Sequence, residues 1–168
     1  MTELAKTMDQ AVKVMIHREG KYLTFYLAGE EYGIGIREVK EIIGMMTITT
    51  VPQMPPYVKG VINLRGKVIP IIDLRLKFGM EADSYTERTC IIVVEISVRD
   101  RGDFFMGIVV DSVSEVLNIK EAEIEDAPNF GVQMSTAYIL GLAKTGSGVK
   151  ILLAIDKVLG SDELDMAA

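Results

Sequence analysis

The chain has 168 residues, a net charge of −6 and 49% hydrophobic residues. This composition excludes a disordered chain, and a globular chain of this length buries about 70% of its surface on folding. The acidic balance, without a basic block, argues against a nucleic-acid partner. One cysteine, one histidine and no tryptophan predict no internal disulfide and no transition-metal site.

The ends of the sequence differ from its middle. Residues 1–19 have weak periodicity and mixed charge, so we expect a flexible N-terminal arm there. Charges interrupt the apolar segment that a signal peptide would need, and no apolar run reaches the 18 or so residues of a membrane helix. We therefore expect a cytoplasmic protein without membrane insertion, folded over residues 20–160 and ending in a tail at 161–168.

Alternating apolar and polar residues predict four β-hairpins along the chain. In the first, Leu23, Phe25 and Leu27 alternate with other residues ahead of a turn at 28–31. Pro70, inside the second hairpin, predicts a sheet edge or a bulge at that position. The four hairpins are expected over residues 22–36, 61–72, 89–110 and 138–155.

Short helical segments are expected between these hairpins. Apolar residues from 36 to 43 fall at helical spacing, and Gly44 stands where a helix would end. Asp73 is predicted to cap a short helix that follows it, and Asp156 to open a C-terminal helix. Residues 112–119 fit a strand or a helix equally. Many short strands with few helices predict an all-β fold of small barrels.

One pair of carboxylates is a candidate for catalysis. Asp73 and Asp111 both end apolar strands, and such a pair at a barrel edge could serve as general acid and base in a hydrolase. The alternative is that each carboxylate caps the segment after it. Cys90 lies in an apolar strand and is interpreted as a small buried hydrophobe, while His17 is interpreted as solvated. We expect no catalysis and no cofactor.

Two charged residues stand in apolar surroundings. Arg65 precedes Gly66 at the tip of a predicted hairpin, so one interpretation is a solvated turn residue. The other is an ion pair with Glu41 that braces the helix expected at 36–44 against the hairpin. Breaking such a pair costs about 3–5 kcal/mol if it is buried and at most about 1 kcal/mol if it is exposed. Spacing alone leaves both interpretations open.

Several apolar residues fall in irregular segments. Met45, Met46 and Met54 are either core residues or parts of an adaptable interface. Phe130, in a polar loop after Pro128, either fills the core of its own chain or anchors a partner. Composition does not choose between these roles.

Two short motifs stand out: Asn-Leu-Arg-Gly at 63–66 and Pro-Ile-Ile-Asp-Leu-Arg at 70–75. They belong to a longer ordered set, which comprises Leu23–Ile34, Val39–Ile42, Tyr57–Gly66, Val68–Arg75 and Gly107–Leu117. From about Tyr22 to Leu159, the sequence resembles the CheW family of bacterial chemotaxis coupling proteins in order and spacing.

The resemblance implies two interlocked SH3-like five-stranded β-barrel subdomains with a few short helices and a groove between them. It implies a non-catalytic adaptor that couples the cytoplasmic tip of methyl-accepting chemoreceptors to the regulatory domain of the histidine kinase CheA, at membrane-associated receptor arrays. Alternatives are a coupling domain of a non-chemotactic kinase array or a CheV-related scaffold, although 168 residues leave no room for a receiver domain. The alternative from another class is a small hydrolase using Asp73 and Asp111.

The resemblance also implies roles for single residues. Glu41 and Arg65 match the family's acidic and basic pair near the receptor-binding region. Phe130 matches an aromatic residue in the loop that meets the kinase, and family members can carry a basic residue at the position of Glu125. The implied receptor-binding residues are Val39, Glu41, Gly60, Arg65, Val113 and Val116. A receptor helical hairpin would lie with its apolar face in the groove.

Overall fold

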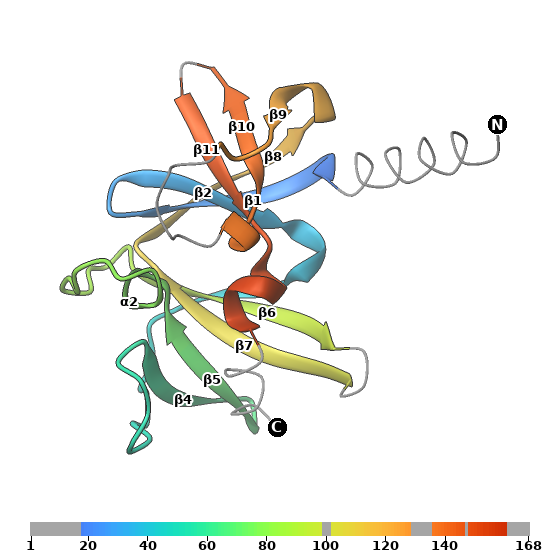
Figure 1. Ribbon diagram of the computed structural model, residues 1–168. Helices are drawn as coiled ribbons and strands as arrows, with labels where there is room; N and C mark the ends of the chain where they lie inside the picture. Colours follow the sequence, from blue (N-terminus) through green and yellow to red (C-terminus); the bar gives the residue numbers. More distant parts are fainter. Residues whose placement is uncertain (1–17, 99–101, 129–135, 147, 161–168) are drawn as a thin grey trace.

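The computed structural model describes residues 18–98, 102–128, 136–146 and 148–160. The chain forms two β-sheets, one above the other in Figure 1, joined by short helical turns and loops. Most of the predicted N-terminal arm, the predicted tail, His17 and Phe130 lie outside the described residues.

The strands follow one another in chain order with few helical interruptions. The helical segments are η1 (Ile36–Glu38), α2 (Leu74–Lys77), η2 (Glu121–Glu123), η3 (Thr136–Tyr138) and residues 155–160. The strands are β1 (Gly20–Leu27), β2 (Glu30–Gly35), β3 (Val39–Gly44), β4 (Val58–Leu64), β5 (Lys67–Asp73), β6 (Cys90–Val98), β7 (Gly102–Val110), β8 (Ser112–Ile119), β9 (Ile124–Glu125), β10 (Ile139–Thr145) and β11 (Gly148–Leu153).

The two sheets are interlocked along the chain. One sheet has the order β8-β1-β2-β11-β10-β9, and the other has the order β3-β6-β7-β5-β4. The first sheet therefore contains the first two strands of the described chain, β1 and β2, and its last four, β8 to β11. Each sheet contains one parallel pair, β2 with β11 and β5 with β7. This arrangement agrees with the expected pair of subdomains, and the two-residue strand β9 gives one of them a sixth strand.

The helix expected at residues 36–44 was a wrong prediction. Only Ile36–Glu38 is helical, and Val39–Gly44 is strand β3, which pairs antiparallel with β6. Ile43 packs against a core while Ile42 is 44% exposed, which is the period-two pattern of a strand. A short cluster of apolar residues fits the period of a helix and that of a strand. The segment forms a strand because β6 offers it an edge with which to pair.

Two further expectations are resolved by strand pairing. Residues 112–119, which fitted either element, form strand β8 because they pair along β1. Pro70 pairs with Val61 of β4, while the parallel ladder to β7 begins one residue later at Ile71. The strand is interior as a whole, but at Pro70 its other side is a local edge, as predicted, and there is no bulge at that residue. The absent N–H of the proline therefore costs no hydrogen bond between β5 and β7.

A large apolar core is shared by both sheets. Strand β6 is buried on its two faces, because successive side chains of a strand point in opposite directions. Ile91 and Val93 face a small core inside the five-stranded sheet, whereas Ile92, Val94 and Ile96 face the shared core. Leu23, Phe25 and Ile34 of the other sheet pack in that same cluster. Burial at this junction holds the two subdomains against each other.

Candidate functional site

The structure brings Glu41 and Arg65 together in an exposed ion pair. Glu41 lies on β3, and Arg65 lies in the turn between β4 and β5. Arg65 and Gly66 both have positive φ, 52° and 87°, and Asn63 Oδ1 accepts the Gly66 N–H at 2.8 Å. The Arg65 side chain is 70% exposed, so the exposed interpretation applies and the pair contributes at most about 1 kcal/mol. It braces a strand rather than a helix against the hairpin.

A hollow of about 290 Å³ lies beside this ion pair, at one end of the five-stranded sheet. Leu64, Ile69, Val93 and Phe105 form its apolar part, and the Lys67 Nζ lies 3.8 Å from the centroid of the Phe105 ring. An apolar floor with charged groups around it is the usual anatomy of a contact surface.

Val39 and Gly60, two other expected receptor-binding residues, take part in internal packing. Val39 is partly buried against the shared core. Gly60 is buried and has φ 139°, and a Cβ at that position would lie 2.0 Å from the carbonyl oxygen of Thr49. Both positions therefore shape the five-stranded sheet beneath its surface.

Val113 and Val116 lie on β8, in the other sheet. Val113 packs against the shared core, while Val116 is 51% exposed. The structure therefore divides the six expected receptor-binding residues between the two subdomains, and it brings Glu41 and Arg65 into direct contact.

A second apolar hollow lies where the two subdomains meet; the resemblance implied a groove between them, but none of the expected site residues lines this hollow. Its volume is about 290 Å³. No single stretch of sequence indicates it, because its residues come from β2, from the segment around α2 and from the β10–β11 hairpin. The lining residues are Tyr32, Lys77, Phe78, Met80, Tyr138, Ile139, Ile151 and Leu153.

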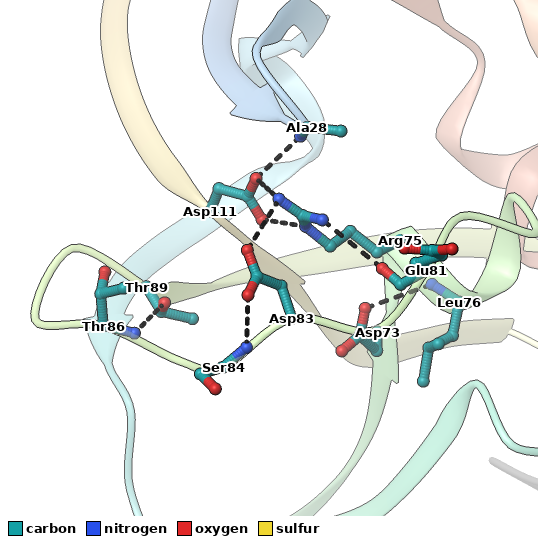
Figure 2. Close-up of polar contacts among 10 residues, drawn as sticks. All are labelled: Ala28, Asp73, Arg75, Leu76, Glu81, Asp83, Ser84, Thr86, Thr89 and Asp111. Atoms are coloured by element: carbon teal, nitrogen blue, oxygen red, sulfur yellow. Dashed lines mark hydrogen bonds and ion pairs between the residues drawn. The ribbon is translucent and has the colours of Figure 1, made fainter.

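Asp73 and Asp111 do converge, but protein groups already occupy both carboxylates (Figure 2). Asp73 accepts from the Leu76 N–H at 3.3 Å and from the Tyr85 hydroxyl at 2.8 Å. The prediction that Asp73 caps α2 is thus confirmed. The space beside the two carboxylates is about 10 Å³, which is room for one water at most. This geometry does not fit the hydrolase alternative.

Asp111 does not cap the segment after it, so that prediction was wrong. It accepts two hydrogen bonds from the Arg75 guanidinium, at 2.7 and 2.6 Å, and one from the Ala28 N–H at 2.8 Å. Partial burial works to raise the pKa of the Asp111 carboxyl, but these hydrogen bonds outweigh it and the pKa is lowered. Asp111 is therefore held as a carboxylate.

The remaining candidates show no reactive arrangement. Cys90 is half-buried against the shared core, and burial raises the pKa of its thiol. Met45 packs against the core of the five-stranded sheet, Met46 is 37% exposed and Met54 is partly buried. Across the described ranges, no three His, Cys, Asp or Glu side chains are placed to hold a metal ion. In the same ranges no helix has the length and apolar character needed to cross a membrane.

The fold places the chain among small all-β proteins in which two interlocked subdomains share one core. Residues 21–163 match the family model of the CheW-like domain. The chain belongs to this family, whose members include chemotaxis scaffold proteins.

Individual relatives agree over nearly the whole chain. A chemotaxis protein CheW of Klebsiella aerogenes is 44% identical over 144 residues, covering 86% of this chain and 84% of that protein. A chemotaxis protein CheW of Rhizobium meliloti is 31% identical, covering 95% of this chain and 100% of that protein. The crystal structure of the scaffolding protein TtCheW from Thermoanaerobacter tengcongensis has a TM-score of 0.75 and 35% identity, covering 86% of this chain and 95% of that one.

Proposed function

We propose that this chain is a non-catalytic adaptor that couples chemoreceptors to the histidine kinase CheA. The observation that supports this most directly is the match of residues 21–163 to the CheW-like domain, and the expected receptor-binding residues are distributed over two subdomains with one core. Glu41 and Arg65 lie on the five-stranded sheet, and Val116 lies exposed on the other sheet. All three residues belong to the expected receptor contact, and the residue expected to meet the kinase, Phe130, lies elsewhere in the sequence, so the receptor and the kinase would bind different parts of one small chain. Its place is the cytoplasm, where it is recruited to membrane-associated receptor arrays.

The proposed receptor contact combines apolar burial on one sheet with a charged pair on the other. Val116, 51% exposed, loses water contact when an apolar helix face covers it. The Glu41–Arg65 pair adds charged hydrogen-bonding groups, and these would fix how the receptor tip is aligned on the surface. Val39 and Gly60 act indirectly, by shaping the sheet that carries the pair.

The kinase contact is assigned to Phe130, on the resemblance alone, because this residue lies outside the described residues. An aromatic side chain at an interface is a typical energetic anchor. Its truncation would therefore weaken binding far more than truncation of an apolar residue elsewhere on the surface.

The test is a calorimetric titration of the protein against the regulatory domain of its cognate CheA. We expect micromolar or tighter binding, and at least a tenfold loss for Phe130→Ala. Val149→Ala is the matched control, because Val149 is 51% exposed on β11 and carries no proposed contact. Retained binding by Phe130→Ala would move the kinase contact to another edge. Absence of binding by the folded parent protein would contradict the kinase assignment and favour a different signalling system.

The receptor side needs its own measurement. A cytoplasmic receptor fragment that contains the helical-hairpin tip is titrated with the parent protein, Arg65→Ala and Val116→Ala. We expect both variants to bind more weakly than the parent, while Val149→Ala binds as the parent does. Equal binding by all four proteins would remove these residues from the receptor contact.

A further inference from the structure

Asp111 occupies the crossing point between the two sheets. It is the one residue between the end of β7, in the five-stranded sheet, and the start of β8, in the six-stranded sheet. Its N–H donates to the Tyr26 carbonyl at 3.0 Å, and its carboxylate accepts from the Ala28 N–H at 2.8 Å. Both partners belong to the first hairpin of the six-stranded sheet.

Arg75 holds the same carboxylate from the other subdomain. It lies on α2, directly after β5, and its Nε and Nη2 donate to the two oxygens of Asp111 (Figure 2). Asp83 lies 3.6 Å from the same guanidinium, and the Glu81 carbonyl accepts from it at 3.4 Å. The Arg75 side chain is only 18% exposed, so this paired arrangement is stronger and more directional than an exposed ion pair.

The backbone held by this arrangement is strained. Ala28 has φ 51° and Gly29 has φ 84°, the conformation of a tight hairpin turn that favours Asn-Gly or Gly-Gly. Alanine rarely adopts a positive φ, and such strain persists only where the surroundings impose it. The Asp111 carboxylate supplies the restraint, because it accepts the N–H of the strained residue itself.

We propose that Arg75 is a positioning residue that, through Asp111, sets the placement of one subdomain relative to the other. The shared apolar core resists separation of the subdomains, but apolar contacts are non-directional and tolerate small sliding movements. A bidentate guanidinium–carboxylate pair restricts that sliding, because it is satisfied in one geometry. The consequence for signalling rests on the proposed adaptor function, whereas the restraint itself does not.

The first test measures amide hydrogen exchange residue by residue in Arg75→Gln. We expect the Ala28 amide to exchange at least tenfold faster, with the Ile92 amide of β6 unchanged. Arg37→Gln is the matched control, since Arg37 is exposed, and it should leave both amides unchanged. Unchanged protection of Ala28 in Arg75→Gln would overturn the proposal. A uniform increase across the whole chain would also overturn it, because Arg75 would then only contribute to global stability.

A charge-swapped double variant separates positioning from simple charge pairing. Arg75→Asp combined with Asp111→Arg restores an ion pair but leaves the Ala28 N–H without its carboxylate acceptor. We expect Ala28 to remain unprotected in this variant. Asp111→Asn keeps an acceptor oxygen and should retain more protection than the swap. Full protection in the swapped protein would show that charge pairing alone suffices, against the proposal.

The signalling consequence is measured in an assembly of receptor fragment, CheA and this protein. We expect Arg75→Gln to bind each partner alone within threefold of the parent, but to lower receptor control of kinase activity by tenfold or more. Normal control by Arg75→Gln would overturn the coupling role. If the parent protein binds neither partner, the adaptor function fails instead, and the exchange experiment still decides whether the restraint exists.

Discussion

Gly60→Ala should be among the most damaging single substitutions on β4. The added Cβ would lie 2.0 Å from the Thr49 carbonyl oxygen, so the Thr49–Val61 bridge must open. That bridge consists of two backbone hydrogen bonds of 2.8 and 2.9 Å, together contributing about 2 kcal/mol. Forcing alanine to φ 139° adds about 1–3 kcal/mol of strain. We therefore expect the free energy of unfolding to fall by about 3–5 kcal/mol.

The measurement is a urea unfolding curve of Gly60→Ala beside the parent protein. Gly44→Ala is the control, because no atom lies within 4 Å of its added Cβ and its φ is not positive; we expect it to change stability by less than about 1 kcal/mol. A loss below about 1 kcal/mol for Gly60→Ala would refute the packing argument. If the variant stays folded yet fails to bind the receptor fragment, Gly60 is a contact residue rather than a structural one.

Two further predictions concern charged groups. In a double-mutant cycle of Glu41→Ala and Arg65→Ala, the coupling energy should be at most about 1 kcal/mol and should shrink as salt is added; a salt-independent coupling of about 3 kcal/mol would indicate a buried pair instead. Burial and the nearby Asp156 raise the pKa of Glu38 from 4.5 to about 7. Between these values the folded protein keeps a proton that the unfolded chain releases, so stability falls as pH rises through that window. Glu38→Gln should therefore raise the urea midpoint at pH 8 relative to the parent but not at pH 4.5, and an equal effect at both pH values would contradict this.

Local sequence signals predicted the hairpins well. Each hairpin combines two apolar-alternating runs with a short turn, so both its strands and their partner lie within a few residues of each other. Asp73 was likewise predictable as a helix cap, because capping joins a side chain to a backbone N–H three residues later. The pairing of β1 with β2 and of β10 with β11 therefore depends on short-range information.

Longer-range information decided the segments that local patterns left open or misassigned. Val39–Gly44 became a strand because β6 offers it an antiparallel partner some fifty residues away along the chain. Residues 112–119 became β8 because they pair with β1. Neither partner is visible in the local periodicity of these segments, and tertiary pairing overrides weak local preference.

The sequence by itself determined an acidic, all-β chain of hairpins with a short helix capped by Asp73, and its motifs pointed to a two-subdomain family. Only the tertiary structure placed Arg75 and Ala28 on the two oxygens of Asp111, since the three come from separate segments of the chain. The same holds for the residues that line the junction hollow and for the burial of Gly60 against Thr49. Residues distant in sequence meet only when the two sheets form. Bringing distant segments of the chain together costs entropy, and burial of the shared apolar core offsets that cost.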